Sequence, residues 1–417
     1  MLSKSQQLAN VLVQQLARRT ATIISARSEY TAAEIEKDLP PPPASPLPQA
    51  DPEKCPVNSY NEWDPLEEVI VGIAEGAVVP HVRPEIRAAI RPTFWPWVRE
   101  NAGKPFAPES LAQAKKEVDE FHRVLELEGC VVRRPEVIDW CALGELKTPD
   151  FSEPGFHTAC PRDGLVVFGN EIVEAPMSWR SRYYDTRPYK NLLNEYFKAG
   201  AKWTLAPKPT MTDHLYDEDY PFEDLEKRTE LAKIGKYELT EAEPAFDAAD
   251  IIRCGKDVFI QISTATNWSG YEWLKRHLAP NIRVHALNMV DPGPLHVDAT
   301  FVPLRPGLIL ANPARPCMQV DFFRKNGWEI IYAPKPTATD DNMLYASQWL
   351  SINVLSLDEK RVVVYDKEVE MKKLFEKYGF QPIGVDMTTA FSLGGAFHCW
   401  TLDVRRKGEL KSYFDKV

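Results

Sequence analysis

One cysteine of this chain has neighbours that suit a nucleophile. Cys399 follows two glycines in the C-terminal stretch FSLGGAFHCWTLDVRRKG (residues 391–408), and His398 precedes it directly. A thiolate is a strong nucleophile, but a free thiol is mostly protonated at neutral pH and needs a partner that activates it. Successive side chains of a strand point to opposite faces, so His398 is a poor base for Cys399 if both lie in the last strand. The partner is expected elsewhere in the sequence.

Other reactive side chains stand just before, or at the start of, predicted strands. They are Arg162 with Asp163, Asp247 with Asp250, His296 with Asp298, Ser347, and His398 with Cys399. If these strands open successive units of one ring, the side chains meet at one end of its axis, and His296 becomes the natural partner of Cys399. Each residue also has an ordinary explanation, since an aspartate such as Asp250 before a strand is often a turn residue.

The chemistry of such a set points to a guanidinium substrate. Several carboxylates oppose a thiolate unless a cation joins them, and the planar N–H donors of a guanidinium match carboxylates. A neighbouring imidazolium lowers the pKa of a thiol and later delivers a proton. A guanidinium that stays charged also has a carbon that is electrophilic towards sulfur. Arg315, in NPARPC, is then the candidate to bind the carboxylate of an amino-acid substrate.

Five helices with matching neighbours are expected to position these residues. Their predicted ranges are 110–129, about 188–200, 269–279, a helix that ends at Gly327, and 366–379. Ser110 and Gln113 indicate a capping box at the start of the first helix. Its apolar residues follow at helical spacing, at Leu111, Ala114, Val118, Phe121 and Leu125.

Apolar strands surround each predicted helix in the same order. One strand follows each helix, at 130–137, 202–207, 282–287, 328–334 and 381–387. A pair of strands precedes each helix, at 67–73 with 77–81, 164–169 with 171–176, 250–254 with 257–263, 299–304 with 307–312, and 352–357 with 361–366. The unit is therefore strand, strand, helix, strand, and it occurs five times. The last strand, HCWTLDV (398–404), has no helix of its own and is expected to return to the first unit and close a ring.

Bulk composition excludes several classes of protein. The 417 residues carry a net charge of -10, which argues against a nucleic-acid-binding protein. The seven cysteines include no CxxC pair, which argues against a zinc site or a disulfide framework. No apolar run is long enough to span a membrane.

The N-terminal region differs from the rest of the chain. Residues 1–28 contain four basic residues and no acid, which is typical of a mitochondrial transit peptide, here predicted over residues 1–38. Residues 39–54 are rich in proline and indicate a stiff linker. Residues 55–417 are then expected to form a single catalytic domain.

The chain resembles the guanidino-group-modifying enzymes, also called penteins or α/β-propeller enzymes, from about residue 55 to its end. The five units carry this resemblance, together with FDAAD (246–250), HVDATF (296–301) and GGAFHCWTLDVRR (394–406). The amidinotransferases of that superfamily are the most similar. The resemblance implies an α/β fold, a five-bladed propeller of ββαβ units around a pseudo-fivefold axis.

The resemblance also implies a reaction and a role for each site residue. Cys399 would attack the guanidino carbon of arginine, and His296, oriented by Asp247, would protonate the departing ornithine. Glycine would then take the amidino group from the cysteine, giving guanidinoacetate, the precursor of creatine. The residues implied to hold the substrate are Asp163 and Asp298 for the guanidinium, and Arg315 and Ser347 for the amino-acid part.

The resemblance implies neither a metal nor an organic cofactor. It implies a homodimer associated with the mitochondrial inner membrane and intermembrane space, with peripheral membrane association and no nucleic-acid partner. One departure is Ala346 before Ser347, where the family pattern has two serines, so the contact at 346 is in doubt.

Other functions fit the same residues less well. They are an arginine deiminase, in which water takes the intermediate, an amidinotransferase acting on an aminocyclitol, and a non-catalytic guanidino-ligand-binding protein. The leader and the motifs favour the arginine-to-glycine transferase. LNMVDPGPLH (287–296), with two prolines and a glycine before His296, suggests a loop that moves over the substrate, although a rigid loop is equally expected.

Overall fold

The computed structural model describes residues 55–338, 344–345 and 347–414. The predicted leader (residues 1–38), the linker (residues 39–54) and Ala346 lie outside these residues. None of the helices described combines the length and the apolar character needed to cross a membrane.

Five three-stranded sheets share one topology, in which the middle strand is antiparallel to one neighbour and parallel to the other. The sheets are β17 (Thr401–Arg406), β1 (Leu66–Val71) and β2 (Val131–Arg133); β5 (Leu165–Phe168), β6 (Glu171–Glu174) and β7 (Lys202–Leu205); β8 (Ile251–Cys254), β9 (Asp257–Gln261) and β10 (Arg283–Leu287); β11 (Phe301–Arg305), β12 (Leu308–Ala311) and β13 (Glu329–Tyr332); β14 (Leu355–Ser356), β15 (Arg361–Tyr365) and β16 (Gln381–Val385).

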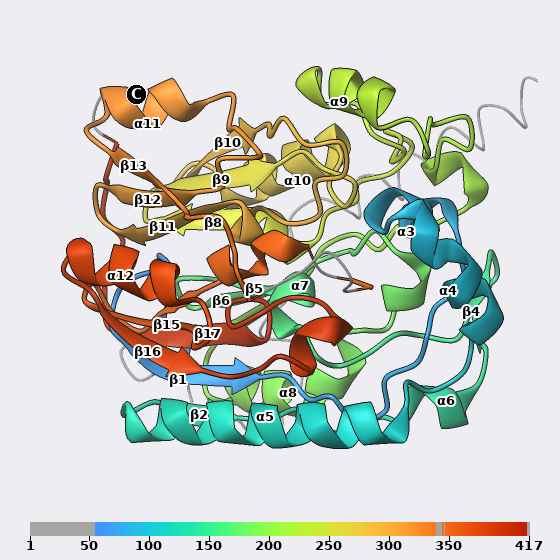
Figure 1. Cartoon of the computed structure of the whole chain (residues 1–417), viewed down its shortest axis with the longest axis horizontal. Coiled ribbons are helices and arrows are strands. Elements are labelled where there is room, and N and C mark those ends of the chain that lie inside the picture. The colour runs from blue at the N-terminus through green and yellow to red at the C-terminus, as the bar shows by residue number, and fades with distance from the viewer. Residues whose placement is uncertain (1–54, 339–343, 346, 415–417) are drawn as a thin grey trace, which may run out of the picture. The chain divides into compact units, whose positions relative to one another are not determined.

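In each sheet, the connection from the middle strand to the third strand contains a helix that contacts the third strand. These helices are α5 (Pro108–Leu127), α8 (Lys190–Lys198), α10 (Trp268–Leu278), α11 (Val320–Lys325) and α12 (Val369–Lys377). They lie on the outer side of the sheets, as α5 does along β1 and β2 in Figure 1. The α/β fold class is confirmed, and the five sheets correspond to the five expected ββαβ units. Their relation by a pseudo-fivefold axis stays a prediction.

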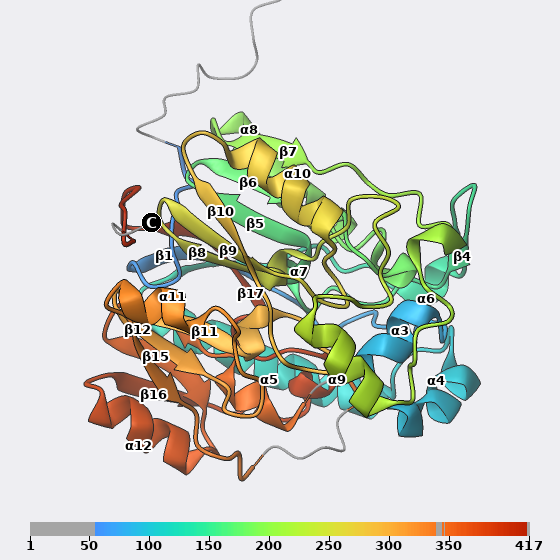
Figure 2. The same ribbon diagram turned by 90° about the horizontal axis from the view of Figure 1, so that it is seen from above.

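The last strand of the described chain completes the first sheet. β17 pairs antiparallel with β1, with Val71 opposite Thr401 and Val69 opposite Asp403. β17 also contacts β5 of the next unit, and β8 contacts β11 (Figure 2). The return of the C-terminal strand to the first unit is therefore confirmed.

Further elements stand outside the five units. They are α3 (Pro84–Ala89), α4 (Trp95–Asn101), α6 (Trp140–Leu143), the hairpin of β3 (Leu146–Lys147) and β4 (Ser152–Glu153), α7 (Pro161–Gly164) and α9 (Leu225–Lys233). Short 3-10 turns include η3 (Arg180–Arg182), η6 (Ala248–Asp250), η7 (Val297–Ala299) and η8 (Gln348–Ile352). In Figure 1, α3, α4 and α6 lie together on one side of the sheets.

The apolar pattern predicted for the first helix gives its buried face. Ala114, Val118, Phe121 and Leu125 of α5 are buried, while Leu111 is only partly buried against the same core. Amphipathic burial of this kind supplies most of the stability of a helix in a folded protein.

Two predictions about the first unit were wrong. The helix begins at Pro108 with Ala107 as its N-cap, so Ser110 and Gln113 lie within it and form no capping box. Proline suits the first helical position because its missing N–H has no partner there. Residues 77–81 are not a strand, because β17 occupies the place beside β1 that they were expected to fill.

A buried network of charges fastens β17 to its neighbours. Asp403 on β17 lies against the guanidinium groups of Arg162, Arg253 and Arg406, and Glu62 pairs with Arg253 at 2.8 Å. Burial alone favours the neutral acid, but the three arginines outweigh it and hold the pKa of Asp403 well below its ordinary value. The strand is therefore held by ion pairs as well as by its backbone.

Replacing Arg253 by methionine is expected to destabilise the fold strongly, because Asp403 and Glu62 lose a cation while both stay buried. Removing one partner of a buried ion pair typically costs about 3–5 kcal/mol of unfolding free energy. Urea unfolding of the variant beside the parent measures this cost. Arg123→Ala, which removes an exposed ion pair with Glu120, is the control and should unfold close to the parent. Equal stability of the Arg253 variant and the parent would contradict a structural role for the network.

Candidate active site

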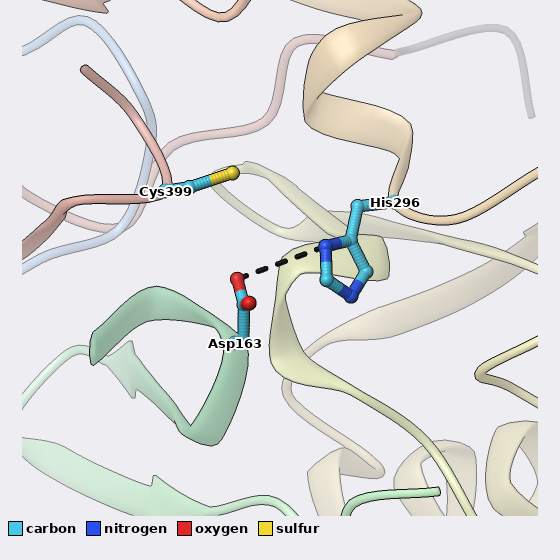
Figure 3. Close-up of side chains that lie close together, drawn as sticks. All are labelled: Asp163, His296 and Cys399. Carbon is cyan, nitrogen blue, oxygen red and sulfur yellow. Dashed lines mark ion pairs between the residues drawn. The ribbon is translucent and has the colours of Figure 1, made fainter. Parts of the chain in front are cut away.

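Five short segments precede the first strands of the five sheets and meet at one place. They are α7, η6, η7, η8 and the turn before β17, with contacts from α7 to η6, from η6 to η7, from η7 to η8, and from β17 to α7. Asp163 lies in α7 and Asp298 in η7. The N-cap residues of η6, η7 and η8 are Asp247, His296 and Ser347, and Cys399 lies in the turn. Figure 3 shows the sulfur of Cys399 directed towards Asp163 and His296. Reactive atoms of these three residues lie within 4.8 Å of one another.

The prediction that His398 and Cys399 both lie in the last strand was wrong. His398 and Cys399 lie in a turn, and the strand begins two residues later at Thr401, so strand alternation does not apply to them. The ring of His398 nevertheless bonds to acids: Nδ1 is 2.7 Å from Asp298 Oδ2 and Nε2 is 3.3 Å from Glu62 Oε2. His398 therefore acts on the site through Asp298.

Cys399 is a buried thiol in contact with an acid. Its Sγ donates to Asp298 Oδ2 at 3.3 Å. Burial, and then the charges of Asp298 and Asp163, raise the pKa of the thiol well above its ordinary value. A neighbouring imidazolium was expected to lower the pKa of this thiol, but before substrate binds, burial and the two carboxylates outweigh that effect. The thiol is therefore protonated at neutral pH until a cation offsets the carboxylates.

Gly395 lets the backbone approach Cys399 closely. Its φ is +75°, and a Cβ there would lie 2.4 Å from the Cβ of Cys399 and 2.9 Å from the sulfur. Only glycine fits both the backbone conformation and the space.

His296 is an imidazolium between two carboxylates. Nε2 lies 3.1 Å from Asp247 Oδ2, and Nδ1 lies 3.7 Å from Asp163 Oδ1. Burial lowers the pKa of the ring, but Asp163 and Asp247 outweigh it and raise the pKa to about 10. The pKa of His296 in the folded protein exceeds its ordinary value. The pairing therefore contributes its full stabilisation below pH ~6.5, and this contribution is lost as the pH rises towards about 10.

The backbone at His296 is strained. Its φ is +92°, a region that side-chain-bearing residues rarely adopt. Strain of this kind persists only where surrounding contacts impose it, and it is concentrated at functional sites. The conformation places the ring between Asp247 and Asp163.

Two residues that sequence reasoning missed hold the carboxylates in place. Arg182 donates to Asp163 Oδ2 at 2.8 Å and to Asp185 Oδ2 at 2.6 Å, and it lies 3.7 Å from Asp247 Oδ2. Ser178 donates to Asp247 Oδ1 from its backbone N–H at 3.1 Å and from its hydroxyl at 3.3 Å. Neither residue stands before the first strand of a unit, so position in the repeat did not indicate them.

Two buried carboxylate oxygens beside the sulfur accept no hydrogen bond from any residue that the structure describes. They are Oδ1 of Asp163 and Oδ1 of Asp298. An unpaired acceptor in a buried place is costly. A guanidinium supplies planar, charged N–H donors that would satisfy both oxygens and bring its carbon next to the thiol. The geometry therefore suits a guanidino substrate.

Arg315 and Ser347 line the same cavity as Cys399, His296 and Asp298, a space of about 480 Å³. Arg315 Nε forms an ion pair with Asp291 at 2.8 Å. Ser347 Oγ accepts from the backbone N–H of Trp349 at 3.1 Å, and its hydroxyl can still donate. Both side chains can reach a ligand in this cavity.

Asp250 proves to be a structural acid. Its carboxylate accepts hydrogen bonds from Gln261 Nε2 at 2.8 Å, Ser263 Oγ at 2.5 Å and Thr266 Oγ1 at 2.6 Å. These donors fix the turn η6 that begins directly after Asp247.

The spacing of Asp163, His296 and Cys399 would also suit a metal ion. Metal ligands must be deprotonated, with a neutral imidazole and a thiolate. The raised pKa values of His296 and Cys399 keep both protonated at neutral pH. These charge states fit an acid and a nucleophile that await a cationic substrate better than they fit a metal site.

Comparison with known proteins shows which family the chain belongs to. No protein-family model matches the chain. The chain is 52% identical over 363 residues to the mitochondrial glycine amidinotransferase of Xenopus tropicalis, covering 87% of this chain and 86% of that protein. It is 47% identical over 413 residues to the mitochondrial glycine amidinotransferase of Danio rerio, covering 99% and 97%. It is 45% identical over 359 residues to the L-arginine:L-lysine amidinotransferase of Pseudomonas savastanoi pv. phaseolicola, covering 86% and 96%.

Solved structures agree with these relatives. An amidinotransferase of the saxitoxin biosynthetic pathway from Microseira wollei is 44% identical with a TM-score of 0.77, covering 86% of this chain and 100% of that one. The inosamine-phosphate amidinotransferase of Streptomyces griseus is 37% identical with a TM-score of 0.77, covering 86% and 99%. The chain belongs to the amidinotransferases of the pentein superfamily and is an enzyme that transfers an amidino group.

Proposed function

We propose that this enzyme moves the amidino group of L-arginine to glycine, giving L-ornithine and guanidinoacetate, the first step of creatine synthesis. One observation carries the proposal: the sulfur of Cys399 lies beside His296 and two buried carboxylate oxygens that accept no hydrogen bond from the described residues. The identity of 52% to a glycine amidinotransferase supports glycine as acceptor.

In the first half-reaction, arginine binds with its guanidinium between Asp163 and Asp298. The cation offsets the carboxylates that hold the thiol protonated, so the sulfur can attack the guanidino carbon. A C–S bond forms, and the bond from that carbon to the side-chain nitrogen breaks. His296 gives its proton to the departing nitrogen, and the thiol proton accompanies it, so ornithine leaves as an ammonium. An amidino-cysteine and a neutral His296 remain.

In the second half-reaction, glycine enters with its ammonium group, which gives one proton to the neutral His296. The free amine attacks the amidino carbon, and the C–S bond breaks. The second proton of the amine returns to the sulfur, so guanidinoacetate leaves and the thiol and imidazolium are restored. Asp247 holds Nε2 of His296, so the other ring nitrogen, Nδ1, faces the reacting atoms.

The carboxylate of each substrate is assigned to Arg315, with Ser347 as a second contact. Both residues line the cavity of Cys399, and a guanidinium binds a carboxylate through two parallel N–H donors. Ala346 offers no hydroxyl, so we expect one hydrogen bond fewer to the amino-acid part of the substrate than two serines would provide.

We further propose a mitochondrial location, at the inner membrane and intermembrane space, and a homodimer. The basic leader supports the location, and so does the alignment with the Danio rerio protein, which is named mitochondrial and covers 99% of this chain. We also propose that the leader is cleaved near residue 38 and that residues 39–54 form a linker.

Supplying arginine with and without glycine distinguishes the transferase from its rivals. Turnover amounts of ornithine and guanidinoacetate are expected only when both substrates are present. Citrulline formed without glycine would indicate a deiminase. Lysine and an aminocyclitol as alternative acceptors test the acceptor class.

Cys399→Ser should lose essentially all transfer, because a hydroxyl is a far weaker nucleophile than a thiolate. Cys254→Ala, at a buried thiol in β8, is the control for the loss of a sulfur. Full activity of Cys399→Ser would overturn the mechanism.

Asp247→Asn should lower the pKa of His296 by roughly 1–3 units, because the ring loses a charged partner. The imidazolium would then be less populated in alkaline solution, and kcat measured there should fall about 100-fold. Titration of the imidazole resonances by NMR, with steady-state kinetics, measures both effects. Asp257→Asn removes a similar carboxylate from His285 and is expected to leave kcat unchanged. A His296 pKa equal to that of the parent would refute the assignment of Asp247.

The loop 287–296 is proposed to close over arginine. It lines the cavity through Asp291, Pro292 and Leu295 and ends at the strained His296. In Cys399→Ser, which should bind without turnover, arginine is expected to slow proteinase K cleavage within the loop. Lysine, which lacks the guanidino group, serves as the control ligand. Cleavage at the same rate with and without arginine would count against motion.

A further inference from the structure

Asn353 is a buried side chain that faces the nucleophile and has no part in the mechanism above. It lies between η8 and β14 and is fully inaccessible to solvent. Its neighbours are the turn that carries Cys399 and the backbone of Asp298. It therefore joins two of the segments that meet at the site.

The carbonyl oxygen of Asn353 organises the nucleophile turn. Oδ1 accepts three backbone N–H groups, from Ala396 at 2.9 Å, Cys399 at 3.1 Å and His398 at 3.2 Å. Three converging donors fix which end of the amide faces the turn, because an NH₂ group in that place would meet them without an acceptor. The amide orientation is thus determined by the backbone.

The amide nitrogen of Asn353 consequently faces the sulfur. Nδ2 donates to Cys399 Sγ at 3.2 Å and to the backbone oxygen of Asp298 at 3.3 Å. A thiol accepts such a bond weakly, whereas a thiolate accepts it strongly, since hydrogen bonds to charged groups are the stronger ones. The contact therefore favours the ionised sulfur over the neutral one.

The charges around the sulfur make a neutral donor valuable. Asp298 and Asp163 oppose the thiolate, Cys160 lies close by, and the imidazolium of His296 lies within 4.8 Å of the sulfur. A second fixed cation beside the sulfur would compete with the guanidinium for the carboxylates. An amide N–H assists the thiolate without neutralising the substrate-binding acids.

We infer that Asn353 is a positioning residue that holds the turn of Cys399 in place and donates a hydrogen bond to its thiolate. The inference rests on the proposed role of Cys399 as nucleophile. By holding the turn, Asn353 sets the direction from which the sulfur attacks. By donating from Nδ2, it favours ionisation of the sulfur.

Asn353→Asp tests the donor separately from the turn. The aspartate keeps an oxygen towards the three backbone N–H groups but loses both N–H donors and adds a negative charge. The rate of Cys399 alkylation by iodoacetamide is followed from pH 7 to 11. The midpoint of this pH profile should move to higher pH, and the rate at a given pH below the midpoint should fall roughly 10- to 100-fold. We expect kcat to fall by a similar factor, with the KM for arginine changed less than threefold.

Asn267→Asp is the matched control. Asn267 is also buried, its Oδ1 accepts from the backbone N–H groups of Ala245 and Gly270, and its Nδ2 donates to two backbone carbonyls. It lies at the start of α10, away from the cavity. Its variant should change the thermal midpoint by an amount similar to Asn353→Asp while keeping the parent alkylation profile and kcat.

Two results would overturn the inference. One is a folded Asn353→Asp variant with the alkylation profile and kcat of the parent. The other is a fall in kcat with an unchanged alkylation profile, which would leave only a structural role. If the aspartate variant does not fold, Asn353→Ser is read by the same criteria, because its shorter side chain keeps a hydroxyl acceptor but cannot reach the sulfur.

Failure of the proposed function has a different signature. Transfer activity that survives complete alkylation of Cys399, or its replacement by serine, removes the nucleophile from the mechanism whatever Asn353 does. A changed alkylation profile in Asn353→Asp depends only on the chemistry of the thiol and can be measured without any substrate.

Discussion

The pairing of β17 with β1 is the constraint on which the rest of this structure depends. It brings the end of the described chain back to the beginning of the first unit and completes the first of the five sheets. The turn that carries Cys399 lies directly before β17 and is therefore delivered to the place where α7, η6, η7 and η8 meet. Arg162 donates to the backbone oxygen of His398 across a separation of 236 residues.

Charge balance explains how so many acids are tolerated in one buried place. Asp163 and Asp247 are offset by Arg182 and His296, and Asp298 Oδ2 lies 2.7 Å from Nδ1 of His398. Burial and the charges of Asp298 and Asp163 raise the pKa of the Cys399 thiol. Under the proposed function, the guanidinium of arginine supplies a cation beside it, so the substrate both fills the site and permits ionisation of the nucleophile.

Regular patterns predicted the elements, and local rules predicted their ends less well. The spacing of Ala114, Val118 and Phe121 identified the buried face of α5, because helical period and burial are the same property seen in sequence and in space. The capping box at Ser110 was wrong because Pro108 starts the helix earlier. The strand at 77–81 was wrong because a segment more than 320 residues away, β17, occupies its place.

The sequence by itself determined which residue types stand before the strands of the repeat, and so which thiol, imidazole and carboxylates share one cleft. It determined this because repeated units place equivalent positions together. The tertiary structure alone decided what each group is bonded to. Arg182 and Ser178 come from outside the pattern, and Asn353, at the start of the predicted strand 352–357, has a neutral side chain that the search for reactive groups passed over. Their contacts set the orientation of Asp163, Asp247 and Cys399. Hydrogen bonds and pKa values depend on distances of a few tenths of an ångström between segments far apart in the chain, and no local pattern carries that information.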